Sequence, residues 1–277
     1  MVNTNNAQEW LNQAIPQNEW QEVEELCILS EDSEGDYYEI SDLHTFPITT
    51  DRLLTGTLNL SNFSNLKRVN VEGQLITKLD LTGCQHLRVL KANDNRLQEI
   101  VWPQFRDNQI PSLADINLSN NNFPACDLSE FRNFTNLVIL SLGTNDRDRI
   151  NRGVYNRWTG SSEPLKNLHE LVALNINGTD INSGIEHLPT KELSCFVFGN
   201  SGRDNAEVNN IQSYLKEKLE LGIEGDVLND WASDKGNYDD VDMAYEKVGA
   251  ICNWVKIQQE QLRQEILVQI EASSSHR

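Results

Sequence analysis

The side chains that most often act as nucleophiles, general bases or metal ligands are scattered along this chain. Its cysteines occur singly and include no Cys-x-x-Cys pair: Cys27, Cys84, Cys126, Cys195 and Cys252. Four of its histidines are just as far apart: His44, His86, His169 and His187. No serine has a recognisable histidine and aspartate partner, no carboxylate pair suggests acid–base chemistry, and isolated glycines form no phosphate-binding loop. We therefore predict that the chain is not an enzyme and has no catalytic residue, metal site or cofactor.

The composition restricts the kinds of partner further. The 277 residues carry 42 acidic and 23 basic side chains, a formal net charge of -19, and show no basic patch. Such a surface repels phosphate backbones and anionic membranes. No apolar run is long enough to span a membrane, and the first residues lack the features of a signal peptide. We expect a cytoplasmic protein with reduced thiols that binds neither nucleic acid nor membranes.

A leucine-rich pattern recurs through the middle of the chain. It has the form Leu-x-x-Leu-x-Leu-x-x-Asn-x-Leu, and its copies begin at Leu66, Leu87, Leu113, Leu137, Leu171 and Leu193, after an opening copy at Val23. The fourth copy breaks off after its asparagine, Asn145. A repeat of about 20 to 30 residues is typical of a stacked solenoid, in which no unit can bury its apolar face alone.

Each copy has the pattern of a short strand followed by a turn. In the Leu-x-Leu core, alternate residues point inward and the intervening ones face solvent, so stacked copies form a parallel sheet with one free, concave face. An asparagine side chain can hydrogen-bond backbone groups of neighbouring turns that would otherwise be buried without partners. We assign this structural role to Asn95, Asn121 and Asn145.

Several segments resemble the intracellular leucine-rich-repeat family, and more closely an expanded fungal group within it. They are the opening Asn-Ala-Gln-Glu-Trp-Leu and the segments 79–84, 153–157, 163–168 and 177–184. The resemblance covers roughly residues 5–203 and implies a repeat fold and a cytosolic binding role, without a defined activity. Some similar members are joined to a protein kinase domain, but this chain contains no kinase motif.

The predicted architecture is an α/β leucine-rich-repeat solenoid with a curved, parallel concave sheet, an N-terminal helical cap and C-terminal α-helices. In the cap, Asn6 and Glu9 have the spacing of a capping box. The predicted segments are the cap over 1–22, the solenoid over 23–203 with an acidic insertion at 31–52 and a loop insertion at 146–165, a capping helix over 204–222, an acidic linker over 223–239, and a long amphipathic helix with a frayed tail over 240–277.

Two of these segments allow more than one interpretation. The acidic insertion is either a solvated loop or a loop that docks a partner or attracts cations. The last helix carries an apolar stripe with a period of about 3.5 residues, which suits packing back on the solenoid, binding a partner helix or weak self-association.

The predicted binding residues lie on the concave face and in the loop insertion. Outward-facing positions change along the solenoid from charged with mixed sign to small and amide-rich: Arg68, Asn70, Glu72, Lys91, Asn93, Asp115, Asn117, Ser141, Asn175, Asn177 and Val197. In the insertion, Tyr155, Arg157 and Trp158 are residue types that dominate protein interfaces. The alternative is that Tyr155 and Trp158 pack beneath the loop.

A broad, preformed concave surface suits a protein or peptide partner, because the receptor loses little conformational entropy on binding. The sequence therefore favours a protein–protein interaction module, either an adaptor or a receptor-like protein, that uses the concave face, the inserted loop or the last helix. The alternative is a subunit of an enzyme with an unrecognised site in the C-terminal helices. Purely structural scaffolding is a third interpretation.

Overall fold

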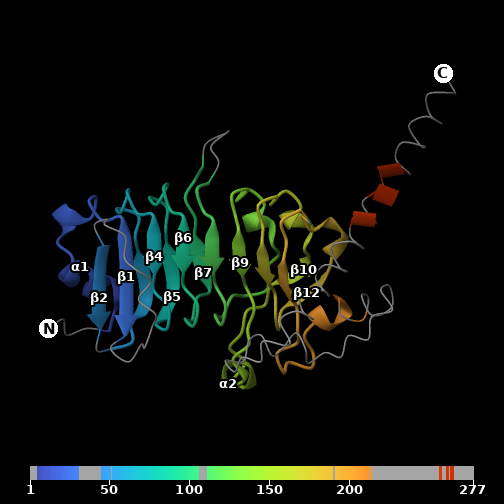
Figure 1. Ribbon diagram of the computed structural model, residues 1–277. Coiled ribbons are helices and arrows are strands. Elements are labelled where there is room, and N and C mark those ends of the chain that lie inside the picture. The colour runs from blue at the N-terminus through green and yellow to red at the C-terminus, as the bar shows by residue number, and fades with distance from the viewer. Residues whose placement is uncertain are drawn as a thin grey trace, which may run out of the picture.

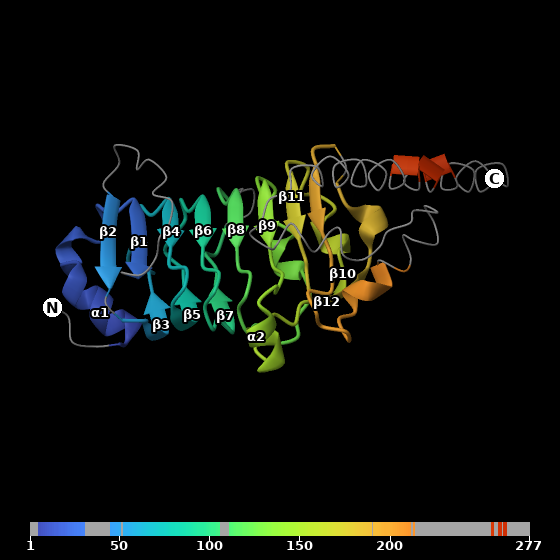
Figure 2. The same cartoon turned by 60° about the horizontal axis from the view of Figure 1, so that its bottom comes forward.

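The chain folds as a parallel β-solenoid, in which successive turns lie side by side from the N-terminal to the C-terminal end (Figures 1 and 2). The computed structural model describes residues 5–30, 45–50, 52–105, 111–189, 191–211 and 213, together with 256–257, 260–261 and 263–264. The predicted fold class, a leucine-rich-repeat solenoid, is confirmed over these turns.

The concave sheet has eight parallel strands in the order β2, β1, β4, β6, β8, β9, β11 and β13. Their bounds are β1 Glu25–Ser30, β2 Thr45–Thr50, β4 Arg68–Asn70, β6 Val89–Lys91, β8 Asp115–Asn117, β9 Ile139–Ser141, β11 Ala173–Asn175 and β13 Cys195–Val197. The central residues of adjacent strands are in register, as in Leu90 beside Ile116 and Ile116 beside Leu140. The strand part of the repeat pattern is therefore correctly predicted.

A second row of strands, not predicted from the sequence, lies on the opposite side of the solenoid (Figure 2). One sheet of this row contains β3 Thr55–Asn59, β5 Leu75–Asp80 and β7 Glu99–Val101, and the other contains β10 Thr159–Ser161 and β12 Asp180–Ser183. Short 3-10 helices occupy other turns: η2 Ser129–Phe131, η3 Glu163–Leu165 and η4 Ile185–His187. The repeat leucines, such as Leu90, Leu140 and Leu174, are fully buried in the core.

Buried amide side chains connect neighbouring turns below the concave sheet. Asn95 donates from Nδ2 to the Val71 carbonyl (2.7 Å) and accepts at Oδ1 from the Ile76 N–H (3.0 Å). Asn121 makes the equivalent two contacts one turn later. Because these carbonyl and N–H groups lie inside the solenoid, the amide supplies partners that water cannot. The structural roles predicted for Asn95 and Asn121 are confirmed.

In the fourth repeat this position belongs to Asn156, so the role predicted for Asn145 is wrong. Asn145 is exposed, whereas Asn156 is fully buried. Asn156 donates to the Leu118 and Leu142 carbonyls, both at 2.8 Å, and accepts from the Phe123 N–H at 3.3 Å. Residues 145–155 are thus inserted between two turn positions that are consecutive in the other repeats.

The N-terminal cap has the predicted construction. Helix α1 spans Ala7–Ala14, and the Asn6 side chain accepts the Glu9 N–H at 3.0 Å. Trp10, Leu11 and Ile15 are buried, and α1 contacts β3. A short 3-10 helix, η1 Gln17–Glu19, follows. The apolar face of α1 therefore covers the first turn of the solenoid, and the polar face of the helix points outward.

Two predicted segment boundaries change. Residues 45–50 form β2 at the outer edge of the concave sheet, so the acidic insertion does not extend to residue 52 as predicted. Its part 31–44 lies outside the described residues. At the other end, Ala206, Val208 and Ile211 are buried, and a helix begins at Val208, four residues after the start predicted for the C-terminal capping helix.

Most of the remaining C-terminal predictions lie outside the described residues. The linker over 223–239 is not described at all, and the six described positions of the last helix are helical and exposed. The alternative function of an enzyme subunit with a site in the C-terminal helices depends mainly on residues outside this description. None of the helices in the described part of the chain is both long and apolar enough to span a membrane.

Candidate functional site

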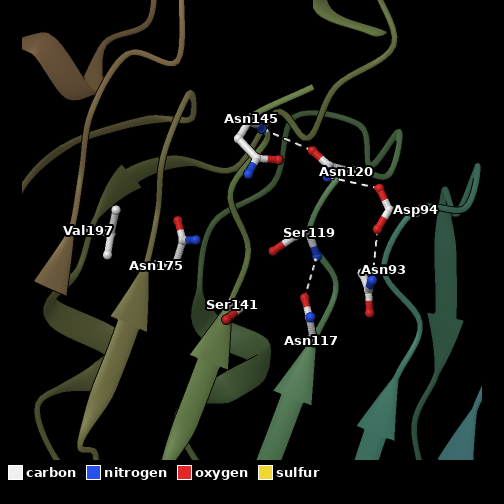
Figure 3. A pocket seen from close by; sticks show the side chains of 9 residues that line it. All are labelled: Asn93, Asp94, Asn117, Ser119, Asn120, Ser141, Asn145, Asn175 and Val197. Atoms are coloured by element: carbon white, nitrogen blue, oxygen red, sulfur yellow. Dashed lines mark hydrogen bonds between the residues drawn. The ribbon is translucent and has the colours of Figure 1, made fainter. Parts of the chain in front are cut away.

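A row of outward-facing side chains crosses the concave sheet at the last residue of each short strand. Strand pairing places these residues in register from β4 to β13. The row consists of Asn70, Lys91, Asn117, Ser141, Asn175 and Val197. All six were predicted as binding residues, and Figure 3 shows the last four at the ends of neighbouring strands. The alternation of inward and outward residues along each strand brings them to one surface.

A cavity of about 350 Å³ lies at this end of the strands. Amides and hydroxyls make up most of its lining, with one carboxylate and one apolar side chain: Asn93, Asp94, Asn117, Ser119, Asn120, Ser141, Asn145, Asn175 and Val197. We call this cavity the amide hollow (Figure 3). The side chains of this lining can form hydrogen bonds, and Asp94 is the only one of them that carries a charge.

The asparagines of the row are held by their own backbone. Asn117 Oδ1 accepts the Ser119 N–H at 3.1 Å, and Asn175 Oδ1 accepts the Asn177 N–H at 3.0 Å. Asn70 makes the same contact with the Glu72 N–H at 3.1 Å. These Asx turns fix the amide planes and occupy the oxygens, so the Nδ2 groups are the donors left for a ligand.

The wall of the hollow is built from turn residues of neighbouring repeats. Asp94 and Asn120 have left-handed backbones, with φ of 57° and 54°, a conformation that Asn and Asp tolerate better than most residues. Asn120 donates to Asp94 at 2.9 Å and accepts the Asn145 N–H at 2.9 Å, while Asn93 donates to the other Asp94 oxygen at 2.7 Å. The wall is thus a continuous hydrogen-bonded chain.

The turn after β9 requires a glycine, Gly143, where it approaches the lining residue Asn175. A Cβ atom on Gly143 would lie 2.5 Å from Asn175 Oδ1 and 2.8 Å from the Asn177 nitrogen. Real Cβ atoms do not approach polar atoms this closely, and one of the two contacts is backbone. Gly143 therefore allows the adjacent turns to approach each other and keeps the Asn175 amide in its Asx turn.

Both basic residues predicted toward the other end of the row have carboxylate partners on neighbouring strands. Lys91 Nζ lies 2.7 Å from Asp115 on the next strand, and Arg68 Nε lies 3.8 Å from Glu25 on β1. These side chains are only partly exposed, so each pair is a cross-strand contact of the sheet. Their charges are consequently compensated within the protein. Arg68, Asn70 and Glu72 lie outside the lining of the amide hollow.

One predicted concave residue does not reach the surface. Asn177 is 1% exposed, and its Oδ1 accepts the Gly199 N–H. The prediction that it binds a partner is wrong, because the chain turns inward directly after Asn175.

Conversely, sequence reasoning missed Asp94, Ser119, Asn120 and the surface role of Asn145. The sequence did contain a usable signal, which is one turn position that recurs in different repeats. This position has a left-handed backbone, and its residues are Gly73, Asp94, Asn120 and Gly178.

The loop insertion packs against the solenoid. Helix α2 spans Arg147–Asn151, and Asp146 caps it by accepting the Arg149 N–H at 3.0 Å. The Arg149 guanidinium donates to the Asn95 carbonyl, and burial lowers its pKa. The insertion therefore spans from its own repeat to the turn of Asn95.

The three residues predicted to bind a partner from this loop have different environments. Trp158 is 1% exposed and packs on Phe123 and Phe131, with ring centroids 4.9 and 5.5 Å away. Its prediction as a binding residue is wrong, and the alternative of packing beneath the loop is confirmed for it. Tyr155 is half-buried, with the guanidinium carbons of Arg157 and Arg203 each 4.4 Å from its ring centre.

The described residues offer little nucleophilic or metal-binding chemistry near the hollow. No histidine or cysteine lines it, and the described part of the chain contains no His, Cys, Asp and Glu group arranged to hold a metal ion. Burial raises the pKa of the Cys84 thiol to about 12 and that of Cys126 to about 11, which keeps both protonated at neutral pH. What the hollow presents is a set of hydrogen-bonding amides and hydroxyls, together with the Asp94 carboxylate.

The repeats, the parallel concave sheet and the buried asparagine positions together define the class of protein, a leucine-rich-repeat solenoid. No family model matches the chain, and no curated protein matches its sequence. Among solved structures, the PEPR1-AtPEP1 crystal structure is 22% identical over 56% of this chain and 21% of that chain, with a TM-score of 0.43.

Two further solved structures are more distant. The leucine-rich-repeat ectodomain of the plant membrane receptor kinase GASSHO1/SCHENGEN3 from Arabidopsis thaliana, in complex with CASPARIAN STRIP INTEGRITY FACTOR 2, is 15% identical over 56% of this chain and 23% of that chain, with a TM-score of 0.31. The plant peptide hormone receptor RGFR1 in complex with RGF2 is 16% identical over 67% and 34%, with a TM-score of 0.37. The chain thus spans about a fifth to a third of the length of these structures.

Proposed function

We propose that this protein is a binding module, an adaptor or receptor-like protein of the cytoplasm, that receives a peptide segment of a partner protein in the amide hollow. The observation that supports the proposal best is the fixed set of unused amide donors at the ends of β8 and β11. Binding to nucleic acid or membranes is not part of the proposal, because the net charge of -19 opposes both.

The hollow suits an extended peptide for two physical reasons. Its donors are oriented before binding, so little side-chain entropy is lost on association. Its lining is uncharged apart from Asp94, and the main chain of a peptide supplies the uncharged carbonyl acceptors that match such donors. Catalysis on a small substrate would require an activated nucleophile or base in the site, and neither histidine nor cysteine lines the hollow.

Site-specific photo-crosslinking tests this proposal. A photoreactive phenylalanine analogue replaces Ser141 in the hollow, or Thr57 on β3 as the control on the opposite side of the solenoid, and both proteins are irradiated in cell extract. Ser119→Tyr is then added to the Ser141 probe, because it fills the hollow without removing a hydrogen-bonded side chain.

We expect a discrete crosslinked protein from position 141, its loss with Ser119→Tyr, and no equivalent product from position 57. Circular dichroism confirms that each variant is folded. Equal products from both positions, or a product from position 141 that survives Ser119→Tyr, would contradict the proposal.

A further inference from the structure

The row across the concave sheet contains an asparagine on every second strand. Asn70, Asn117 and Asn175 lie on β4, β8 and β11, with β6 and β9 between them. All three are held in the same Asx turn, so their Nδ2 groups repeat with the same orientation. With about 4.8 Å between neighbouring strands, the donors recur about every 9.6 Å across the sheet.

We propose that the concave sheet binds a proline-rich segment in the polyproline II conformation, whose carbonyl groups at every third residue accept from Asn70, Asn117 and Asn175. This inference rests on the proposed function and specifies the ligand. Polyproline II rises about 3.1 Å per residue with three residues per turn, so equivalent carbonyls recur about every 9.3 Å.

Other regular peptide conformations do not match this spacing. An α-helix repeats about every 10.8 Å after two turns, and its carbonyls are already hydrogen-bonded within the helix. A β-strand presents equivalent residues about every 6.8 Å, which falls between the donors. A polyproline II segment has no internal hydrogen bonds, so all of its carbonyls remain available.

The hydrogen-bonding character of the row favours proline itself. Each Oδ1 atom of the three asparagines already accepts one hydrogen bond in its Asx turn, so these side chains are better placed to donate from Nδ2 than to accept a further hydrogen bond. If the ligand had many main-chain N–H groups, these donors would face the Nδ2 donors of the asparagines and could not form hydrogen bonds with them. Proline has a carbonyl but no N–H, which makes a proline-rich segment complementary to this surface.

The charge of the face adds a second requirement. Lys91 and Arg68 are paired with Asp115 and Glu25, whereas Glu72 forms no ion pair with any residue of the described chain. Glu72 follows β4 directly, and the opposite end of the row is the apolar Val197. The ligand therefore carries a lysine or arginine at the end that lies over β4.

Calorimetric titration of the full chain with synthetic peptides tests the inference. The probes are nonaproline, nonaproline with a lysine at either end, and a glycine–serine peptide of equal length. We expect nonaproline to bind at least tenfold more tightly than the glycine–serine peptide, and one of the two lysine peptides to bind more tightly than the other.

Asn117→Asp and Asn175→Asp are the informative variants, because aspartate keeps the Asx-turn oxygen and removes the Nδ2 donor. Each should weaken nonaproline binding about fivefold, the effect of losing one hydrogen bond. Asn133→Asp, which adds the same charge at an exposed position next to η2, should leave binding unchanged.

The outcomes separate this inference from the proposed function. If nonaproline binds no better than the glycine–serine peptide, or if the aspartate variants bind it like the unsubstituted chain, the inference is overturned. If the photo-crosslink at position 141 is nevertheless obtained and lost with Ser119→Tyr, the proposed function stands and only the polyproline ligand is rejected.

Discussion

Asparagine has three distinct roles in this protein, and the backbone position decides which one applies. At Asn95, Asn121 and Asn156 the amide is buried and joins adjacent turns. At the strand ends it closes an Asx turn and presents a donor, as at Asn117. At Asn120 it tolerates a left-handed backbone in the wall of the hollow. The same side chain therefore contributes to the core, to the binding surface and to the turn between them.

The buried role has a measurable consequence at Asn156. Asn156→Ala leaves the Phe123 N–H and the Leu142 carbonyl without the partners that Asn156 gives them. At about 1–3 kcal/mol per unsatisfied buried group, we expect the free energy of unfolding to fall by about 3 kcal/mol. Asn145→Ala, the matched control at the exposed position, should change it by less than about 0.5 kcal/mol. Urea denaturation measures both, and equal losses would contradict the assignment.

Among the elements, the strands of the concave sheet were predictable and the opposite row was not. Alternating apolar residues around Leu90 and Leu140 specify a strand with one buried face. On the opposite side, β5 and β7 form only because successive turns lie side by side. The local sequence pattern does not predict this pairing. The position of β2 beside β1 has the same cause, since pairing joins segments separated by residues 31–44.

The candidate site was predictable in its strand positions and not in its turns. Asn117 and Asn175 followed from alternation along the strands. The wall did not, because Asp94 and Asn120 meet through hydrogen bonds between different repeats. Asn145 was misassigned because counting along the chain ignores the insertion. The segment Asn156-Arg157-Trp158 matches Asn121-Asn122-Phe123 and would have located the interrupted repeat.

Removal of the insertion should leave a regular solenoid. Asn156 N lies 3.0 Å from Thr144 Oγ1, so the two ends of a deletion of residues 145–155 already lie close together. Thr144→Gly is included, because the equivalent position has a left-handed backbone in Gly73 and Gly178. We expect a far-ultraviolet circular dichroism spectrum that changes only by the loss of the short helix α2. Thermal unfolding should stay cooperative at a moderately lower temperature, since Arg149 no longer binds the Asn95 carbonyl.

The same deletion carrying Asn156→Ala in addition provides the control. It leaves the buried position of this repeat without an amide side chain, so the Phe123 N–H and the Leu142 carbonyl lose the partner that Asn156 gives them. We expect this variant to lose cooperative unfolding. If the two deletion variants were equally stable, the assignment of 145–155 as the insertion would be untenable.

At the scale of the whole molecule, each turn contacts mainly its neighbours, and stability is close to a sum of local terms. The N-terminal end depends on α1, which covers β3 with Leu11 fully buried. The amide hollow lies several turns away, toward β13. Damage to the cap should therefore loosen one end of the protein and leave the hollow intact.

Leu11→Asp tests this separation by burying a charge in the cap. Hydrogen exchange followed by mass spectrometry should show amide protection falling at least tenfold in β1 and β3 and remaining unchanged in β9 and β11. Gln13→Asp, at an exposed position of α1, is the matched control and should alter neither region. Loss of protection spread evenly over all strands would show that the solenoid unfolds as a single unit.

The position of β2 outside β1 also bears on self-assembly. The Arg68 N–H bonds to the Glu24 carbonyl, so the even-numbered residues of β1 face β4 and the odd-numbered ones face β2. With Cys27 opposite Pro47, the nitrogen of Pro47 then points away from β1. A solenoid that ended in a complete row of amide hydrogens could recruit a second molecule end to end and grow into fibres. Proline has no N–H, so Pro47 interrupts that row in the middle of β2.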